Sequence, residues 1–223
     1  MTVDAGAVHA VVANGEESLA CTDLIVQGGG TVALNGGSIV QIRNVSNSGT
    51  IDGSPSGTLD VNGDWTNNGS FVAAGSTVRL SNRCGASTLQ LSGATTFNNL
   101  DISGQNANSP ITVVLPSPNT VVTAVNGALT FGGNGTPVAI SGPTCAGILL
   151  GPNAPAPNLA NVTLGPGIWI ARQPPAQCGG GTPGGQAVPV PGLGMAGAGW
   201  LSLLLGGVAA WGRRRARQYA PRR

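Results

Sequence analysis

A short internal repeat is the feature that most restricts the fold of this 223-residue chain. The segment NSGTIDGSPSGTLDV (47–61) aligns with NNGSFVAAGSTVRL (67–80) after one deletion, and GTVALNGGSIVQI (30–42) keeps the same rhythm upstream. The alignment places these residues opposite one another: Asn47 and Asn67, Gly49 and Gly69, Ile51 and Phe71, Leu59 and Val78, Thr31 and Thr50, Ile39 and Leu59. Short strands and tight turns at a fixed period of about 19–20 residues indicate a solenoid of β-coils.

Apolar and polar residues alternate in short runs between residues 22 and 140, and Gly and Asn separate the runs. Such alternation is typical of β-strands. One coil cannot bury its inward side chains alone, so coils stack about 4.8 Å apart, with each inward residue on its counterpart. We expect an all-β chain whose body is a β-solenoid (a parallel β-helix) of roughly six coils, with Asn and Gly at its corners. The alternative is an antiparallel sandwich.

Charged residues make up only 8% of the chain, and all ten basic residues are arginines. Helical bundles and coiled coils need many more charged and helix-forming residues, so both are excluded. Residues 1–187 contain four arginines and all eight carboxylates, which gives a net charge of −4, whereas the last eleven residues contain six arginines. Nucleic-acid binding needs a basic face, so nucleic acid is not an expected partner of the body.

An apolar stretch runs from Leu193 to Trp211 with a single polar side chain, Ser202. As a helix it would measure roughly 28 Å, close to the thickness of a bilayer core. A basic cluster follows it: Arg213, Arg214, Arg215 and Arg217. Arginines of this kind stay cytoplasmic, so we expect one transmembrane helix over 193–211, with the body across the inner membrane. Residues 1–20 have no signal-peptide pattern, so we expect a signal peptide upstream of this chain.

A proline-containing motif precedes the apolar stretch and consists of Val188, Pro189, Val190, Pro191, Gly192 and Leu193. The motif, the span and the arginine cluster together resemble C-terminal sorting signals of Gram-negative bacteria, the PEP type and especially the IPTL type. The motif departs from that type, which has Ile-Pro-Thr-Leu. The resemblance implies a membrane-embedded sorting protease as a partner and an inner-membrane intermediate that reaches the outer cell surface or the medium. The alternative is a plain single-span anchor.

Two segments of the body, GDWTNNGSF (63–71) and TTFNNL (95–100), resemble repeats of bacterial surface and adhesin-like β-helix proteins. The expected organisation has five parts: a solenoid body over 1–144, a Pro-rich capping segment over 145–178, a Gly-rich linker over 179–187, the sorting signal over 188–217, and a basic tail over 218–223. A body, a flexible spacer and a spanning tail are the layout of a displayed protein.

Four widely spaced cysteines suggest two disulfides in an exported protein. Pairing of sequence neighbours gives Cys21–Cys84 and Cys145–Cys178, and the second would tie the capping segment over the open end of the solenoid. The first has a geometric cost, because the two residues lie about three coils apart, roughly 14 Å, and a disulfide needs Cα atoms within about 7 Å. One of them must leave the stack on a loop, and residues 82–85 are the candidate.

The residue types needed for catalysis or metal binding are sparse. His9 is the only histidine, and Asp52 and Asp101 are isolated in the sequence. The segment Asp60–Asp64 (DVNGD) has the look of half a calcium loop but lacks the later bidentate glutamate, and a turn explains it equally well. We therefore expect no catalytic residue, no metal and no cofactor.

These observations favour a non-enzymatic cell-surface or extracellular-matrix protein that acts as a structural spacer or adhesin. Its expected partners, besides the sorting protease and the inner membrane, are a surface polysaccharide or a host surface. A membrane-tethered β-helix carbohydrate-active enzyme and an anchored calcium-stabilised binding module are the alternatives. Enzymes of that kind usually need several carboxylates in one cleft, so convergence of three or more carboxylates within about 10 Å would favour the enzyme.

Overall fold

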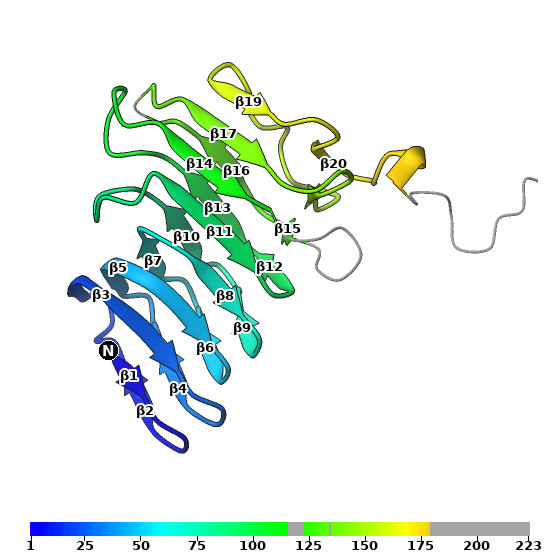
Figure 1. Cartoon of the computed structure of the whole chain (residues 1–223). Coiled ribbons are helices and arrows are strands. Elements are labelled where there is room, and N and C mark those ends of the chain that lie inside the picture. The colour runs from blue at the N-terminus through cyan, green and yellow to red at the C-terminus, as the bar shows by residue number, and fades with distance from the viewer. Residues whose placement is uncertain (116–122, 134, 179–223) are drawn as a thin grey trace, which may run out of the picture. The chain divides into compact units, whose positions relative to one another are not determined.

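The computed structural model describes residues 1–115, 123–133 and 135–178, which form an all-β solenoid (Figure 1). All the strand pairs between these residues are parallel, which excludes the antiparallel sandwich. The stack has about seven turns rather than six, because coils also form before residue 22 and after residue 140. In this part of the chain the one helical element is a 3₁₀ turn, η1 (Ala176–Cys178).

Successive strands of a coil belong to three faces (Figure 1). The first face contains β1 (Thr2–Val3), the second half of β3 (Glu16–Val26), the second half of β5 (Ser38–Asn47), β8 (Trp65–Asn67), β11 (Thr88–Ser92), β14 (Ile111–Val114), β17 (Val138–Ser141) and β19 (Val162–Leu164). The second face contains β2 (Val8–Ala10), β4 (Thr31–Ala33), β6 (Thr50–Asp52), β9 (Ser70–Val72), β12 (Thr95–Phe97), β15 (Thr123–Val125), β18 (Gly147–Leu150) and β20 (Trp169–Ala171). The third face contains the first halves of β3 and β5, β7 (Thr58–Val61), β10 (Thr77–Leu80), β13 (Asn99–Ile102) and β16 (Leu129–Phe131).

The strand register confirms the repeat alignment. Strand pairing joins the residues predicted to be equivalent: Asn47 with Asn67, Ile51 with Phe71, Leu59 with Val78, Thr31 with Thr50, and Ile39 with Leu59. Inward apolar residues such as Ile39, Ile51 and Leu59 are fully buried. Each therefore packs on its counterpart in the next coil, which is how short strands acquire a continuous core.

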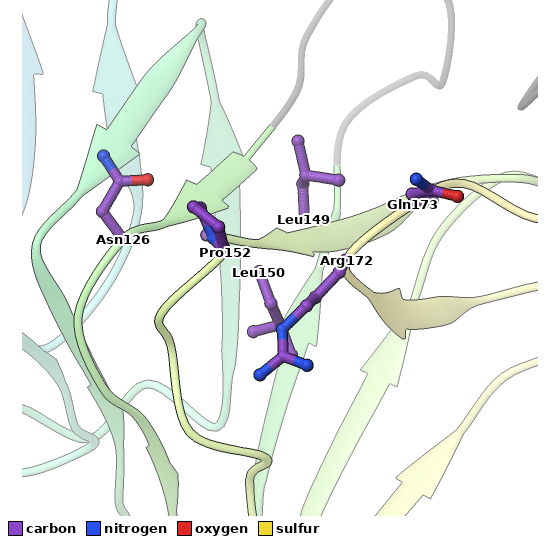
Figure 2. A pocket seen from close by; sticks show the side chains of 7 residues that line it. Asn126, Leu149, Leu150, Pro152, Arg172 and Gln173 are labelled. Atoms are coloured by element: carbon purple, nitrogen blue, oxygen red, sulfur yellow. The ribbon is translucent and has the colours of Figure 1, made fainter. Parts of the chain in front are cut away.

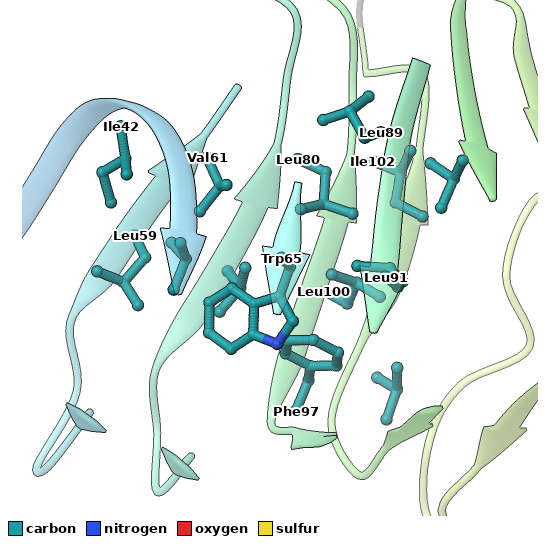
Figure 3. Close-up of a cluster of buried hydrophobic side chains, with 14 of the residues drawn as sticks. Ile42, Leu59, Val61, Trp65, Leu80, Leu89, Leu91, Phe97, Leu100 and Ile102 are labelled. Carbon is teal, nitrogen blue, oxygen red and sulfur yellow. The ribbon is translucent and has the colours of Figure 1, made fainter. Parts of the chain in front are cut away.

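Polar and aromatic residues also stack inside the solenoid. The Asn47 side chain donates to Asn67 Oδ1 at 2.8 Å, and the Asn67 side chain donates to the Thr95 hydroxyl at 3.2 Å. The same hydroxyl accepts the indole N–H of Trp65 at 3.0 Å, and Figure 3 shows Trp65 beside Phe97 in the core. These bonds satisfy polar groups that would otherwise be costly to bury, and they repeat along the stack as expected for asparagine.

Both predicted disulfides are formed. The Cα atoms of Cys21 and Cys84 are 5.6 Å apart, and those of Cys145 and Cys178 are 5.3 Å apart. Cys21 lies at the bend of β3 with a φ of 63°, whereas Cys84 lies on the loop after β10, residues 81–87. This loop leaves the stack and returns to the earlier coil, which removes the geometric cost expected from the spacing of the coils.

The solenoid continues past residue 144, so the body boundary expected there is wrong. Strands β18 and β20 extend the second face and β19 extends the first, although all three lie in the segment expected to be a cap. These strands are hard to recognise in the sequence because each has only three or four residues and because a proline-rich segment (151–161) separates β18 from β19. The disulfide of Cys145 still joins the last coils to η1.

The predicted linker, sorting motif, membrane span and arginine cluster lie outside the described residues. Within the described ranges, no helix has the length and apolar character needed to cross a bilayer.

Candidate functional site

Polar side chains form a row on the outer surface of the third face. Asp60 on β7, Arg79 on β10, Asp101 on β13 and Thr130 on β16 occupy one register position. Adjacent strands are about 4.8 Å apart, so acid, base and acid follow one another at contact distance. This Asp60–Thr130 row brings together groups from four successive coils that are far apart in the sequence.

Hydrogen-bond donors of the protein occupy both carboxylate oxygens of Asp101. Its Oδ2 accepts from Arg79 Nε at 3.0 Å, and its Oδ1 accepts from the hydroxyls of Ser103 at 2.6 Å and Thr130 at 3.0 Å. The Asp101 side chain is 20% exposed. This carboxylate is therefore suited to orienting Arg79, and it offers little free acceptor surface to a substrate proton.

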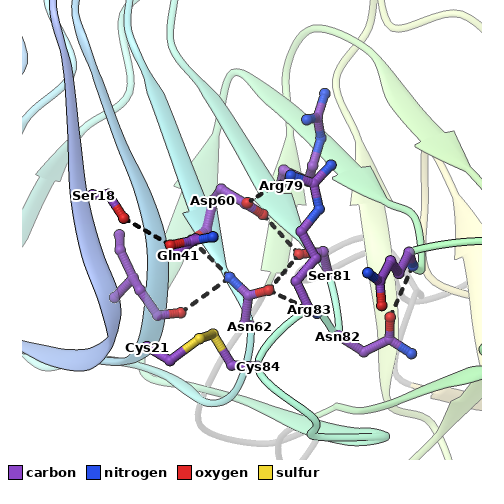
Figure 4. A network of polar contacts seen from close by, with 12 residues as sticks. Ser18, Cys21, Gln41, Asp60, Asn62, Arg79, Ser81, Asn82, Arg83 and Cys84 are labelled. Atoms are coloured by element: carbon purple, nitrogen blue, oxygen red, sulfur yellow. Dashed lines mark hydrogen bonds and ion pairs between the residues drawn. A yellow bond between two sulfur atoms is a disulfide. The ribbon is translucent and has the colours of Figure 1, made fainter.

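Asp60 also points out of the solenoid, yet its side chain is only 3% exposed (Figure 4). The Ser81 hydroxyl lies 2.7 Å from Asp60 Oδ1 and 2.8 Å from Asn62 Oδ1, and its one proton serves one of them at a time. Asn62 Oδ1 also accepts the backbone N–H of Arg83 at 2.8 Å. The network fastens the 81–87 loop to β7, and the loop in turn covers Asp60.

Arg79 and Arg83 converge on a shallow hollow of about 180 Å³. Its remaining lining residues are Asp101, Ser103, Gly104 and Gly133, so the described lining is polar and has no aromatic ring. Figure 4 shows the two arginines beside Asp60, next to the Cys21–Cys84 disulfide. The disulfide anchors the loop that carries Arg83, and this anchorage places a second guanidinium beside that of Arg79.

A larger hollow of about 590 Å³ lies near the last coils (Figure 2). It is lined by Asn126, Leu149, Leu150, Gly151, Pro152, Arg172 and Gln173. Arg172 is engaged in the structure, since its Nη2 donates to the Ala154 carbonyl at 2.9 Å. No carboxylate lines this hollow among the described residues, so it lacks an acid–base pair.

The other residues considered from sequence have structural partners. His9 Nε2 is 2.7 Å from Glu17 Oε2, a contact that sequence spacing did not suggest. Asp52 accepts the backbone N–H of Ser54, and Asp64 accepts that of Gln90. In the segment that resembles half a calcium loop, Asp60 Oδ1 and Asp64 Oδ1 thus accept hydrogen bonds from the protein itself. In residues 1–115, 123–133 and 135–178, no three His, Cys, Asp or Glu side chains gather as metal ligands.

Sequence reasoning missed Arg79, Arg83 and Ser103 as site residues. One available signal was composition, because two of the four arginines in residues 1–187 lie four positions apart beside a predicted strand. The repeat did not predict the pairing of Arg79 with Asp101. The sequence separation between these two residues is longer than the separation between Asp60 and Arg79, which matches the repeat period.

Comparisons with family models, with curated proteins and with solved structures gave no match for this chain. Two disulfides indicate an oxidising compartment, periplasmic or extracellular.

Proposed function

We propose that this chain is a non-enzymatic exported protein of the cell surface or extracellular matrix, which acts as a structural spacer or adhesin. The observation that carries the proposal is a continuous parallel solenoid whose coils two disulfides tie together. Repeated coils form a stiff, extended body, and disulfides keep such a body intact in an oxidising environment. The outer faces are available for contact.

The arrangement of carboxylates supports a role without turnover. Among the described residues, Asp101 is the one carboxylate that lines the Arg79–Arg83 hollow, and Asp60 behind it is nearly inaccessible. General acid–base catalysis needs groups that reach the substrate and exchange protons with it. The alternative, a membrane-tethered β-helix carbohydrate-active enzyme, requires Asp101 to give up its contacts with Arg79, Ser103 and Thr130.

Export is proposed to use the C-terminal signal. A membrane-embedded sorting protease would cut near Val188–Leu193 after the body has crossed the inner membrane. The resemblance of the motif, the apolar stretch and the arginine cluster to IPTL-type signals supports this route, and so does the oxidising compartment that the disulfides indicate.

The route predicts a loss of surface delivery when the motif is damaged. The full chain with an upstream signal peptide is expressed in a Gram-negative host that carries a sorting protease, and fractions are probed for the body. We expect Pro189→Ala/Pro191→Ala to retain the body at the inner membrane, whereas Pro183→Ala, outside the motif, is delivered normally. Deletion of 188–217 is expected to leave the body in the periplasm. A body that stays cytoplasmic in all variants would refute the proposed topology.

A further inference from the structure

We propose that the Arg79–Arg83 hollow binds the carboxylate groups of an acidic polysaccharide, with one uronic acid residue seated in it. This inference rests on the proposed adhesin function and names its ligand class. Residues 1–187 contain only four arginines and no lysine, and two of those arginines line this one hollow. Each of the two arginines also faces an aspartate, Asp101 for Arg79 and Asp60 for Arg83, so the hollow is distinguished by two adjacent guanidiniums with open N–H donors and not by a net positive charge.

The two guanidiniums retain unused hydrogen-bond donors. Arg79 donates through Nε to Asp101, and Arg83 Nη1 is 3.8 Å from Asp60 Oδ2, beyond hydrogen-bonding distance. No described residue accepts a hydrogen bond from the Nη groups of Arg79 or from the Arg83 guanidinium. Their side chains are 41% and 48% exposed, so these N–H groups are open to a ligand.

The Arg79 side chain and the backbone of Arg83 are held in position before any ligand arrives. Asp101 directs Arg79 from the next strand, and the buried Asp60 lies behind Arg83. The backbone of Arg83 is fastened by Asn62, and the neighbouring Cys84 is fastened by its disulfide. Binding therefore loses less conformational entropy in the Arg79 side chain and in the loop that carries Arg83 than it would if neither were fixed.

The chemistry of the lining selects the ligand class. Arginine matches the planar carboxylate with paired N–H bonds. The Ser103 hydroxyl donates its proton to Asp101, so toward a ligand it can only accept a hydrogen bond, for example from a sugar hydroxyl. A neutral sugar ring usually relies on aromatic stacking, and no aromatic side chain of the described residues lines the hollow. A peptide could not add as a strand, because β10 and β13 are already paired on both sides. A polysaccharide remains, whose neighbouring residues extend over the open face.

The test uses the full chain, exported with an upstream signal peptide and purified in mild detergent. Calorimetry measures its affinity for tetragalacturonate and for the fully methyl-esterified tetragalacturonate, which has the same rings without the negative charges. We expect the ester to bind at least tenfold more weakly. We also expect Arg79→Gln and Arg83→Gln each to lower the affinity for the acid at least tenfold.

Arg43→Gln is the matched control. Arg43 donates from Nε and Nη2 to both oxygens of Asp23 at 2.9 Å, and these bonds hold the pKa of the Asp23 carboxyl below its ordinary value. Arg43 lies outside the hollow, so its loss is expected to leave the affinity within twofold of the original. The comparison separates a specific site from a general effect of removing one positive charge.

Gly133→Leu tests the hollow without changing any charge. A Cβ at Gly133 would have only the Ser103 Oγ nearby, at 3.7 Å, and its φ is not in the left-handed region, so the backbone accepts a side chain. We expect unchanged thermal unfolding and at least a tenfold loss of affinity. The inference is overturned if the original chain does not bind tetragalacturonate, if the ester binds equally, or if neither arginine variant weakens binding. Cleavage of the bound probe would instead refute the non-enzymatic function and leave the site in place.

Discussion

Replacing Cys21 and Cys84 together by serine is expected to lower the free energy of unfolding by about 4 kcal/mol. The disulfide closes a sequence separation of 63 residues, and the entropy that such a link removes from the unfolded chain grows with the logarithm of loop length. The loop of residues 81–87 would also lose its attachment to the bend of β3. The loss of Arg83 positioning is expected to weaken tetragalacturonate binding as well.

Denaturant unfolding followed by circular dichroism measures this effect under oxidising conditions. The matched control is Cys145→Ser/Cys178→Ser, whose disulfide closes a separation of 33 residues. The logarithmic dependence makes the two losses differ by less than about 1 kcal/mol, but only the first should change the affinity for tetragalacturonate. An unchanged unfolding midpoint in the first variant would show that the link does not constrain the unfolded chain.

Trp65→Ala is expected to cost about 3–5 kcal/mol of unfolding free energy. Trp65 is fully buried, and its ring centroid lies 5.2 Å from that of Phe71 and 5.4 Å from that of Phe97. Truncation leaves a cavity beside the two phenylalanines, whose own ring centroids are 5.9 Å apart. It also deprives the buried Thr95 hydroxyl of the indole donor.

Trp65→Phe separates the two contributions. It keeps an aromatic ring but removes the N–H, so we expect a loss of about 1 kcal/mol from the hydrogen bond, with a further cost for the smaller ring. Circular dichroism is the readout, because the substitution removes a fluorophore. A loss in Trp65→Phe equal to that in Trp65→Ala would mean that the indole hydrogen bond, not the packing of the rings, stabilises this coil.

The predictability of the fold from sequence follows the regularity of the coils. Between Thr31 and Leu80 the coils keep a nearly constant length, and the alignment of Leu59 with Val78 is the observed register. After Leu80 the coils lengthen, and the sequence separation between Leu100 and its partner Leu129 is much longer than that between Leu59 and Val78. Loops inserted at corners change the period without changing the inward side chains. The repeat therefore fades from the sequence although the stack continues to Ala171.

The candidate site could not be predicted from the sequence, because it also depends on coils of irregular length. Asp101 is an isolated carboxylate in the sequence. It lies beside Arg79 because of the combined length of the long 81–87 loop and the short turn between β12 and β13, and the repeat predicts neither. The segment from Asp60 to Asp64 resembles half a calcium loop as much as a turn in sequence, and the two carboxylates accept bonds from separate segments, through the Ser81 hydroxyl and the Gln90 backbone N–H. The disulfides were easier, because four cysteines allow only three pairings.

The Cys21–Cys84 link has a mechanical consequence for a body that is pulled from its ends. A covalent bond between the second coil and the loop after β10 carries tension past the intervening coils, so the hydrogen bonds between those coils bear little load. The 63 residues of sequence separation correspond to roughly 200 Å of contour length, at about 3.3 Å per residue. An applied force cannot stretch this part of the chain until the disulfide is reduced. A force applied at the ends of the body would therefore extend only the coils outside the two linked segments.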